Sequence, residues 1–126
     1  VGSPRLETLL RQSADTILIG HAPGFWAEIS GNIKPENKFI YPRGPIETEG
    51  SLPELLRTHT NLYADLSANS GLNAISRDRA FGIRFLKEFQ DQLFCKGRVR
   101  CQPGVQSLRP RFSQLGPWRD HSAWYL

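Results

Sequence analysis

The sequence predicts an α/β fold with parallel strands. Helix-like segments and short apolar segments alternate along residues 5–94, and this order predicts parallel strands joined by helical crossovers. The first strand-like segment is continuously apolar, which is typical of a parallel strand covered on both faces. With 126 residues, of which 39% are hydrophobic, the chain has the size and composition of one globular domain.

The first helix and strand follow from the apolar pattern near the N-terminus. Segment 5–13 places Leu6, Leu9 and Leu10 on one helical face, so we expect a helix there. The β-forming run at 16–20 ends in a glycine and is expected to be a buried strand.

The segment 22–50 is expected to be a long irregular region. Prolines interrupt helices and ladders, and this segment contains Pro23, Pro35, Pro42 and Pro45. A connection of this length usually has a function. Phe25 and Trp26, near its start, either line a substrate pocket or are buried beneath the loop. The sequence leaves both readings open.

A second helix and strand are expected after this region. Ser51 is an N-cap residue type and Glu54 has the capping-box spacing, so a helix is predicted over 52–60. His59 lies near the end of that helix, where a surface histidine suits the helix dipole. The apolar segment 61–66 is then expected to be the second strand.

The third helix and strand complete the alternation. Small and polar residues at 67–73 predict a loop, with Gly71 in a turn. Asp78 is an N-cap candidate, and the helix it begins has apolar residues at helical spacing, namely Phe81, Phe85, Leu86 and Phe89. Gly82 is expected at a close helix contact, and 91–94 begins a third strand.

The last quarter of the chain has a different composition. Residues 1–94 contain 10 Lys/Arg against 11 Asp/Glu, whereas residues 95–126 contain 6 against 1. No apolar periodicity persists there, so we expect a basic, irregular tail. Basic residues mixed with aromatics suit single-stranded nucleic acid, but they show no helical register, and nucleic acid is not expected as a partner. Cys95 and Cys101, with His121 further on, are too widely spaced for a zinc knuckle. We expect two unrelated thiols.

His21 is the most informative candidate site residue. It directly follows the first predicted strand, and parallel α/β proteins place reactive groups at the carboxyl ends of their strands. An imidazole there binds a metal or transfers a proton near neutral pH. The alternative is a histidine that only caps the strand end by hydrogen bonding, and the position alone does not decide between them.

Four segments together resemble the amidohydrolase-related family of metal-dependent hydrolases and decarboxylases. They are ILIGHAPGFW at 17–26, YPRGP at 41–45, NLYADLSANSGLNAISRD at 61–78 and FGIRFLKEFQDQLF at 81–94. The resemblance implies that residues 1–94 form a partial (β/α)₈ TIM barrel, about strands six to eight. It implies a small carboxylate- or amide-type substrate and a divalent metal, in the first place zinc.

The resemblance also assigns roles to individual residues. His21 matches the strand-six histidine, which in this family ligates the metal or holds and activates the metal-bound water. A bound divalent ion lowers the pKa of such water to about 7. Asp65 and Ser67 fall at the end of strand seven, facing the active-site mouth, where substrate contact is the expected role. The catalytic candidates are therefore His21 and Asp65, and the metal candidate is His21.

The departures from the family pattern are equally specific. The first-strand His-x-His pair and the strand-five ligand have no counterpart, and Cys95-Lys96-Gly97 stands where the family continues with Gly-Thr-Asp. One candidate ligand remains, whereas zinc needs three or four. We therefore expect this chain alone to hold the metal weakly and to be inactive.

The resemblance stops at Phe94, where the composition also changes. This coincidence favours a shifted reading frame over a genuine extension for residues 95–126. The competing hypotheses for function are a non-enzymatic truncated or frame-shifted product and a small basic binding module.

Location and partners follow from what the sequence lacks. No apolar run is long enough to cross a bilayer, and the N-terminus lacks the order of a signal peptide. Two cysteines are too few for a disulfide framework. We expect a cytoplasmic chain with no membrane partner, which self-associates through the strand edges that a partial barrel leaves unpaired.

Overall fold

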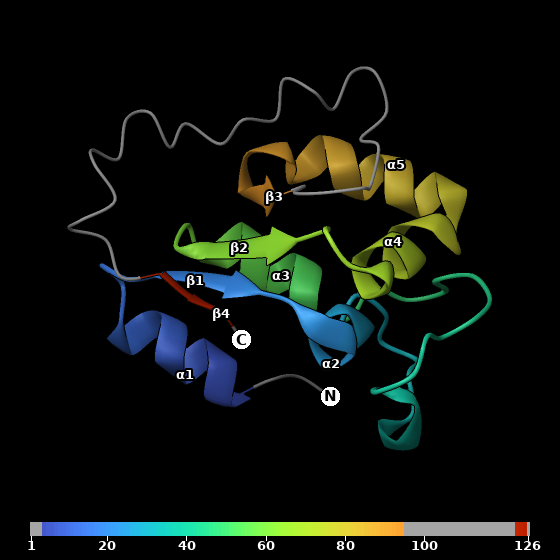
Figure 1. Cartoon of the computed structure of the whole chain (residues 1–126), viewed down its shortest axis with the longest axis horizontal. Coiled ribbons are helices and arrows are strands. Elements are labelled where there is room, and N and C mark those ends of the chain that lie inside the picture. Colours follow the sequence, from blue (N-terminus) through green and yellow to red (C-terminus); the bar gives the residue numbers. More distant parts are fainter. Residues whose placement is uncertain (1–3, 95–122, 126) are drawn as a thin grey trace.

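A computed structural model describes residues 4–94 and the backbone of residues 123–125 (Figure 1). This part of the chain is a mixed α/β protein, as predicted, with helices around a small parallel sheet. The helices are α1 (Pro4–Gln12), α2 (Ala22–Ala27), α3 (Ser51–Thr58), α4 (Asn69–Ser76) and α5 (Arg79–Glu88). The strands are β1 (Ile17–Gly20), β2 (Leu62–Asp65), β3 (Leu93–Phe94) and β4 (Ala123–Tyr125).

The sheet has the strand order β3-β2-β1-β4, and every neighbouring pair is parallel. Leu18 pairs with Leu62, and Ala64 pairs with Leu93. Strands β1 and β2 therefore end at the same edge of the sheet, with α2 and α4 following them there (Figure 1). Parallel pairing thus brings the residues after Gly20 close to the end of β2. That these strands belong to a (β/α)₈ barrel stays a prediction.

The N-cap predicted for the last helix is confirmed. The carboxylate of Asp78 accepts a hydrogen bond from the backbone N–H of Phe81 at 3.0 Å, which satisfies one of the free donors of the first turn. The pKa of Asp78 lies below its ordinary value because the N–H groups of Phe81 and Ile46 stabilise the charged carboxylate. Gly82 is a close helix contact, as expected, because a Cβ there would lie 2.0 Å from the carbonyl oxygen of Ile75.

The capping prediction for the second helix is wrong. The N-cap of α3 is Gly50, with no side-chain cap. The Ser51 hydroxyl instead donates to Glu28 Oε2 at 2.8 Å, so it ties α3 to the end of α2. The apolar face of this helix is buried as expected, with Leu52, Leu55 and Leu56 in the core.

Two predicted loops contain helices. In 22–50, α2 begins with a proline in its first turn, a position where the missing N–H is harmless. In 67–73, the small residues belong to α4, whose buried Ser70, Gly71 and Ala74 allow it to pack closely. A Cβ at Gly71 would lie 3.1 Å from the Trp26 ring. The small residues therefore serve a close contact of the helix α4, and the prediction of a turn at Gly71 is wrong.

The tail is described only at β4, a strand that the prediction of an irregular tail missed. Its partner is the outer edge of β1. Residues 95–122 and 126 lie outside the described residues, and so do the cysteines and His121. The proposed domain division at residue 94, the zinc-knuckle reading and the nucleic-acid reading stay predictions for that reason.

The core lies where the helices meet the sheet. Its buried side chains include Leu10, Leu18, Trp26, Ile29, Leu52, Leu56, Leu62 and Leu93. One polar side chain joins the N-terminal helix to both central strands: Asn61 Nδ2 lies 3.1–3.3 Å from the carbonyl oxygens of Leu10, Ser13 and Thr16. None of the described helices is long and apolar enough to cross a membrane.

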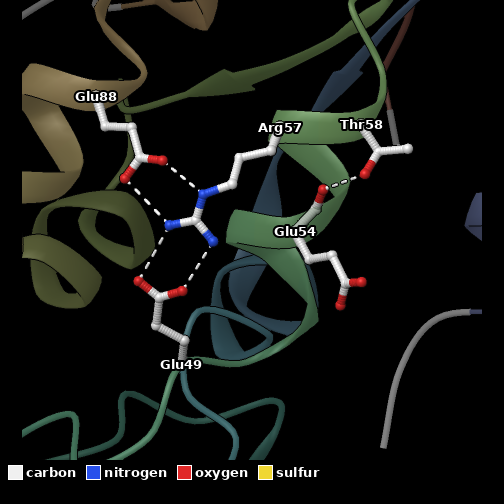
Figure 2. A network of polar contacts seen from close by, with 5 residues as sticks. All are labelled: Glu49, Glu54, Arg57, Thr58 and Glu88. Carbon is white, nitrogen blue, oxygen red and sulfur yellow. Dashed lines mark hydrogen bonds and ion pairs between the residues drawn. The ribbon is translucent and has the colours of Figure 1, made fainter.

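A salt-bridge network joins α3 to its surroundings (Figure 2). The Arg57 guanidinium pairs with Glu88 on α5 at 2.5 and 3.1 Å, and with Glu49 at 2.9 and 3.2 Å. It also lies 5.5 Å from the centre of the Phe89 ring. These hydrogen bonds raise the pKa of Arg57 and lower the pKa of Glu88. The network fixes α3 between α5 and the preceding loop.

Candidate functional site at the carboxyl edge of the sheet

His21 lies at the carboxyl end of β1, where the sequence predicted it. The strand ends at Gly20, and a Cβ there would lie 2.0 Å from the Phe25 ring, so any larger residue would have to displace that ring. His21 itself is extended, and Ala22 follows with φ of +79°. A non-glycine residue in the left-handed region costs about 1–2 kcal/mol. The strained turn sends the chain into α2 immediately after the histidine.

Asp65 lies at the end of the neighbouring strand and faces His21. Its Oδ2 is 3.1 Å from His21 Nδ1. The Asp65 side chain is 12% exposed and that of His21 is 35% exposed. Nδ1 itself is buried and has no aligned hydrogen-bond partner, so the contact is close but not ideally oriented. Catalytic contacts of this kind often tighten only when a ligand binds.

Ser67 completes a short chain of polar contacts. Its backbone N–H donates to Asp65 Oδ1 at 2.8 Å and its hydroxyl donates to Oδ2 at 2.7 Å. These two bonds hold the carboxylate in one orientation, with Oδ2 shared between Ser67 and His21. The structure thus brings together all three residues that the sequence placed at this edge.

Trp26 packs beneath the same edge of the sheet and hydrogen-bonds to the backbone of Asp65. It is 2% exposed, and its indole Nε1 donates to the backbone oxygen of Asp65 at 3.0 Å. Phe25 packs edge-on against it, with ring centres 5.6 Å apart. Each of the two predictions for this aromatic pair therefore holds for one residue. Trp26 is buried in the core, whereas Phe25 lines a cleft.

The cleft beside His21 has a volume of about 560 Å³. Its walls come from α1, α2, α3 and the loop near Phe39, and they are largely apolar. Apolar lining residues include Leu6, Leu9, Phe25, Phe39, Leu52 and Leu55. A volume of this size falls within the ~300–1,000 Å³ of small-molecule sites. His21 is thus positioned between a fixed carboxylate and an apolar cleft.

The chemistry of this arrangement depends on which ring nitrogen carries the proton. A carboxylate opposite Nδ1 favours the tautomer with hydrogen on Nδ1. Nε2 is then a free lone pair that can accept a proton or bind a metal. Both readings of His21, a reactive group and a strand cap, are consistent with its contact with Asp65.

The described residues do not by themselves form a metal site. Within 4–94 and 123–125, no group of three or more His, Cys, Asp or Glu side chains is placed to hold an ion. The Asp65 carboxylate contacts His21 Nδ1 directly, so the two side chains do not point together toward a space that an ion could occupy. A zinc site needs three or four ligands, so these residues do not fit the cofactor that the resemblance implies, and His21 as a metal ligand stays a prediction.

His59 differs from its prediction. It is 9% exposed and is the C-cap of α3, so it is not a surface residue. Its Nε2 is buried without a hydrogen-bond partner in the described part of the chain. Gln92 Nε2 donates to its carbonyl oxygen at 3.0 Å. The helix ends at Thr58, two residues earlier than predicted.

A second cleft, of about 580 Å³, lies apart from His21 and is lined by Glu7, Glu49 and Glu54. Two of its carboxylates already have partners, because Glu7 pairs with Arg11 and Glu49 with Arg57. His59, whose Nε2 has no partner within the described residues, also lines this second cleft. What distinguishes the edge with His21 is the carboxylate of Asp65, held opposite the imidazole ring.

Comparisons with known proteins add nothing to this geometry. A scan of protein-family models, a search of curated proteins and a search of solved structures find no match to this chain.

Proposed function

We propose that His21 is a proton-transfer residue of a hydrolase or decarboxylase of the amidohydrolase-related family, acting on a small carboxylate- or amide-type substrate. The observation that carries the proposal is the 3.1 Å approach of Asp65 Oδ2 to His21 Nδ1. The order β3-β2-β1 is that of consecutive barrel strands, and barrel enzymes place their sites at the carboxyl edge. Strand β4, from the end of the chain, pairs with the other edge of β1 and lies outside that order.

The role of each residue follows from its contacts. Asp65 holds the imidazole in one orientation and stabilises it when it gains a proton. Ser67 holds Asp65 through two hydrogen bonds. His21 Nε2 takes a proton from the reacting group, or returns one to it. General acid–base catalysis of this kind contributes about 10²–10⁴-fold to a rate.

The metal implied by the resemblance plays no part in these steps. Zinc remains the expected cofactor of the family, with ligands that the described residues do not supply. The competing hypothesis, a chain with no activity of its own, makes the opposite prediction for turnover.

Turnover tests the proposal. Hydrolysis and decarboxylation are measured on a panel of small amides and carboxylates, with and without Zn²⁺, in the full chain and in any longer protein that includes it. We expect His21→Ala to lower turnover by about 10²–10⁴-fold wherever activity is found. The exposed Asp91→Ala variant is the control. Near-normal turnover by His21→Ala would remove the assignment, and no turnover in either protein favours the non-enzymatic hypothesis.

A further inference from the structure

Two exposed apolar side chains line the cleft beside His21. Leu9, on α1, is 38% exposed and Phe39 is 80% exposed, and both belong to the walls of this cleft. The buried side chains of Leu52 and Leu55, on α3, line it as well. Apolar surface gathered in one groove marks a place where a ligand or partner binds. The cleft therefore suits a ligand with an apolar group.

Phe39 is held at the cleft by its neighbours in space. The adjacent Lys38 forms an ion pair with Glu28, the C-cap of α2, and Glu28 also accepts a hydrogen bond from the Ser51 hydroxyl. The Phe39 ring lies against Gly24, where a Cβ would be 3.2 Å from it. The ring is thus positioned beside the cleft while most of its surface stays in contact with water. A ligand that covered this ring would bury apolar area.

The charged groups that line the cleft leave one cation without a partner. Glu28 and Lys38 neutralise each other. Arg5 also lines the cleft, and it forms no ion pair with another described residue. It lies in the first turn of α1, where the helix dipole adds to the positive potential. The cleft therefore favours a ligand that carries a negative charge.

We propose that this cleft binds a monocarboxylate with an extended apolar group, which covers Leu9 and Phe39 while Arg5 attracts the carboxylate. The volume of about 560 Å³ accommodates such a ligand. This inference rests on the proposed function, in which the reacting group of the same ligand lies at His21. It narrows the substrate class to apolar anions and excludes cations and compact polar acids.

Three ligands of one length and different charge test the role of Arg5. The full chain is titrated with hexanoate, hexanol and hexylammonium and followed by ¹H–¹⁵N NMR. We expect hexanoate to bind about two- to fivefold more tightly than hexanol and hexylammonium to bind most weakly. In 1 M salt the Debye length is about 3 Å, so these differences should shrink. Arg5→Gln should remove the preference for the anion, whereas Arg79→Gln, which removes an exposed arginine on α5, should retain it.

A series of carboxylates of increasing length tests the apolar walls. From butanoate through hexanoate to octanoate, we expect each added methylene to tighten binding by about two- to fourfold. Leu9→Asn should weaken this dependence on length. Leu72→Asn is the matched control, because Leu72 lies on α4, is 43% exposed and is not part of this cleft. It should leave the dependence unchanged.

The titrations of the wild-type chain do not depend on how the variants fold. Equal affinities for the three hexyl ligands, or no gain in affinity from butanoate to octanoate, would overturn the proposal. Backbone shifts confined to residues outside the cleft would do the same. An anion preference that persists in Arg5→Gln would contradict the assignment of Arg5.

Binding and turnover distinguish this inference from the proposed function. His21→Ala should bind octanoate as tightly as the wild-type chain, because the apolar walls and Arg5 remain. Binding with the expected preferences in a wild-type chain that shows no turnover would support the site and remove the proposed reaction. Turnover of small substrates, with no effect of apolar length on binding, would support the reaction and overturn this inference.

Discussion

Replacing Arg57 by glutamine removes the charge at the centre of the network that joins α3 to α5 and to Glu49 (Figure 2). The side chains of Arg57, Glu49 and Glu88 are 42%, 46% and 43% exposed, so water and salt screen both ion pairs. Exposed ion pairs contribute about 0.2–1 kcal/mol each to stability. Because Arg57 makes two hydrogen bonds to each glutamate, both pairs are expected near the upper end of that range. The contact with Phe89 adds about 0.5 kcal/mol.

We therefore expect Arg57→Gln to lower the free energy of unfolding by about 1–2 kcal/mol, measured by urea denaturation at pH 7. A double-mutant cycle with Glu88→Gln isolates the coupling of that pair, which we expect to be about 0.5–1 kcal/mol. Arg79→Gln is the control, because Arg79 is exposed on α5 and forms no ion pair with another described residue. In 1 M salt the Debye length is about 3 Å, and the coupling should shrink.

The pH dependence of stability tests the same network independently. The hydrogen bonds from Arg57 lower the folded-state pKa of Glu88. A lowered carboxylate pKa gives stability that is fully present above the unfolded value and is lost as pH falls through the folded value. Between about pH 5 and pH 3 the wild-type chain should lose more stability than Arg57→Gln. Parallel pH profiles and zero coupling at pH 7 would refute the reasoning.

Three further substitutions test the packing around the candidate site. Trp26→Phe removes the hydrogen bond to the Asp65 backbone and leaves a cavity, so urea denaturation should show a loss of about 2–3 kcal/mol; an unchanged midpoint would contradict the buried contact. Gly82→Ala forces a Cβ against the Ile75 carbonyl, and a loss of about 2 kcal/mol is expected in the same assay, although alanine is the better helix former. Ala22→Gly relieves the left-handed backbone and should leave stability equal or raise it by up to about 1 kcal/mol; a clear loss would argue against that conformation.

The sequence predicted elements whose signal is local. The apolar run that became β1 needed no tertiary information, because a short continuous apolar segment ending in glycine is typical of a buried parallel strand. Asp78 is similar, since an N-cap depends only on the next three residues. The positions of His21 and Asp65 at one edge follow from parallel pairing alone.

The elements that the sequence missed depend on contacts distant in the chain. Residues 67–73 were expected to form a loop because most of them are small or polar. The small residues Ser70 and Gly71 are instead buried where α4 packs against its neighbours α2 and α5. The backbone of His59 is held by Gln92, 33 residues away in the chain, which donates to its carbonyl oxygen. The Arg57 network likewise joins residues up to 31 positions apart, and no local pattern signals it.

The tautomer of His21 tests the central claim most directly, because it reports whether Asp65 fixes the ring. Long-range ¹H–¹⁵N NMR correlations of the neutral imidazole distinguish a proton on Nδ1 from one on Nε2. We expect the Nδ1–H form to dominate in the wild-type chain and in the Asp91→Ala control, and the Nε2–H form to gain population in Asp65→Ala. A ring with its proton on Nε2 in the wild-type chain, unchanged by Asp65→Ala, would contradict the account.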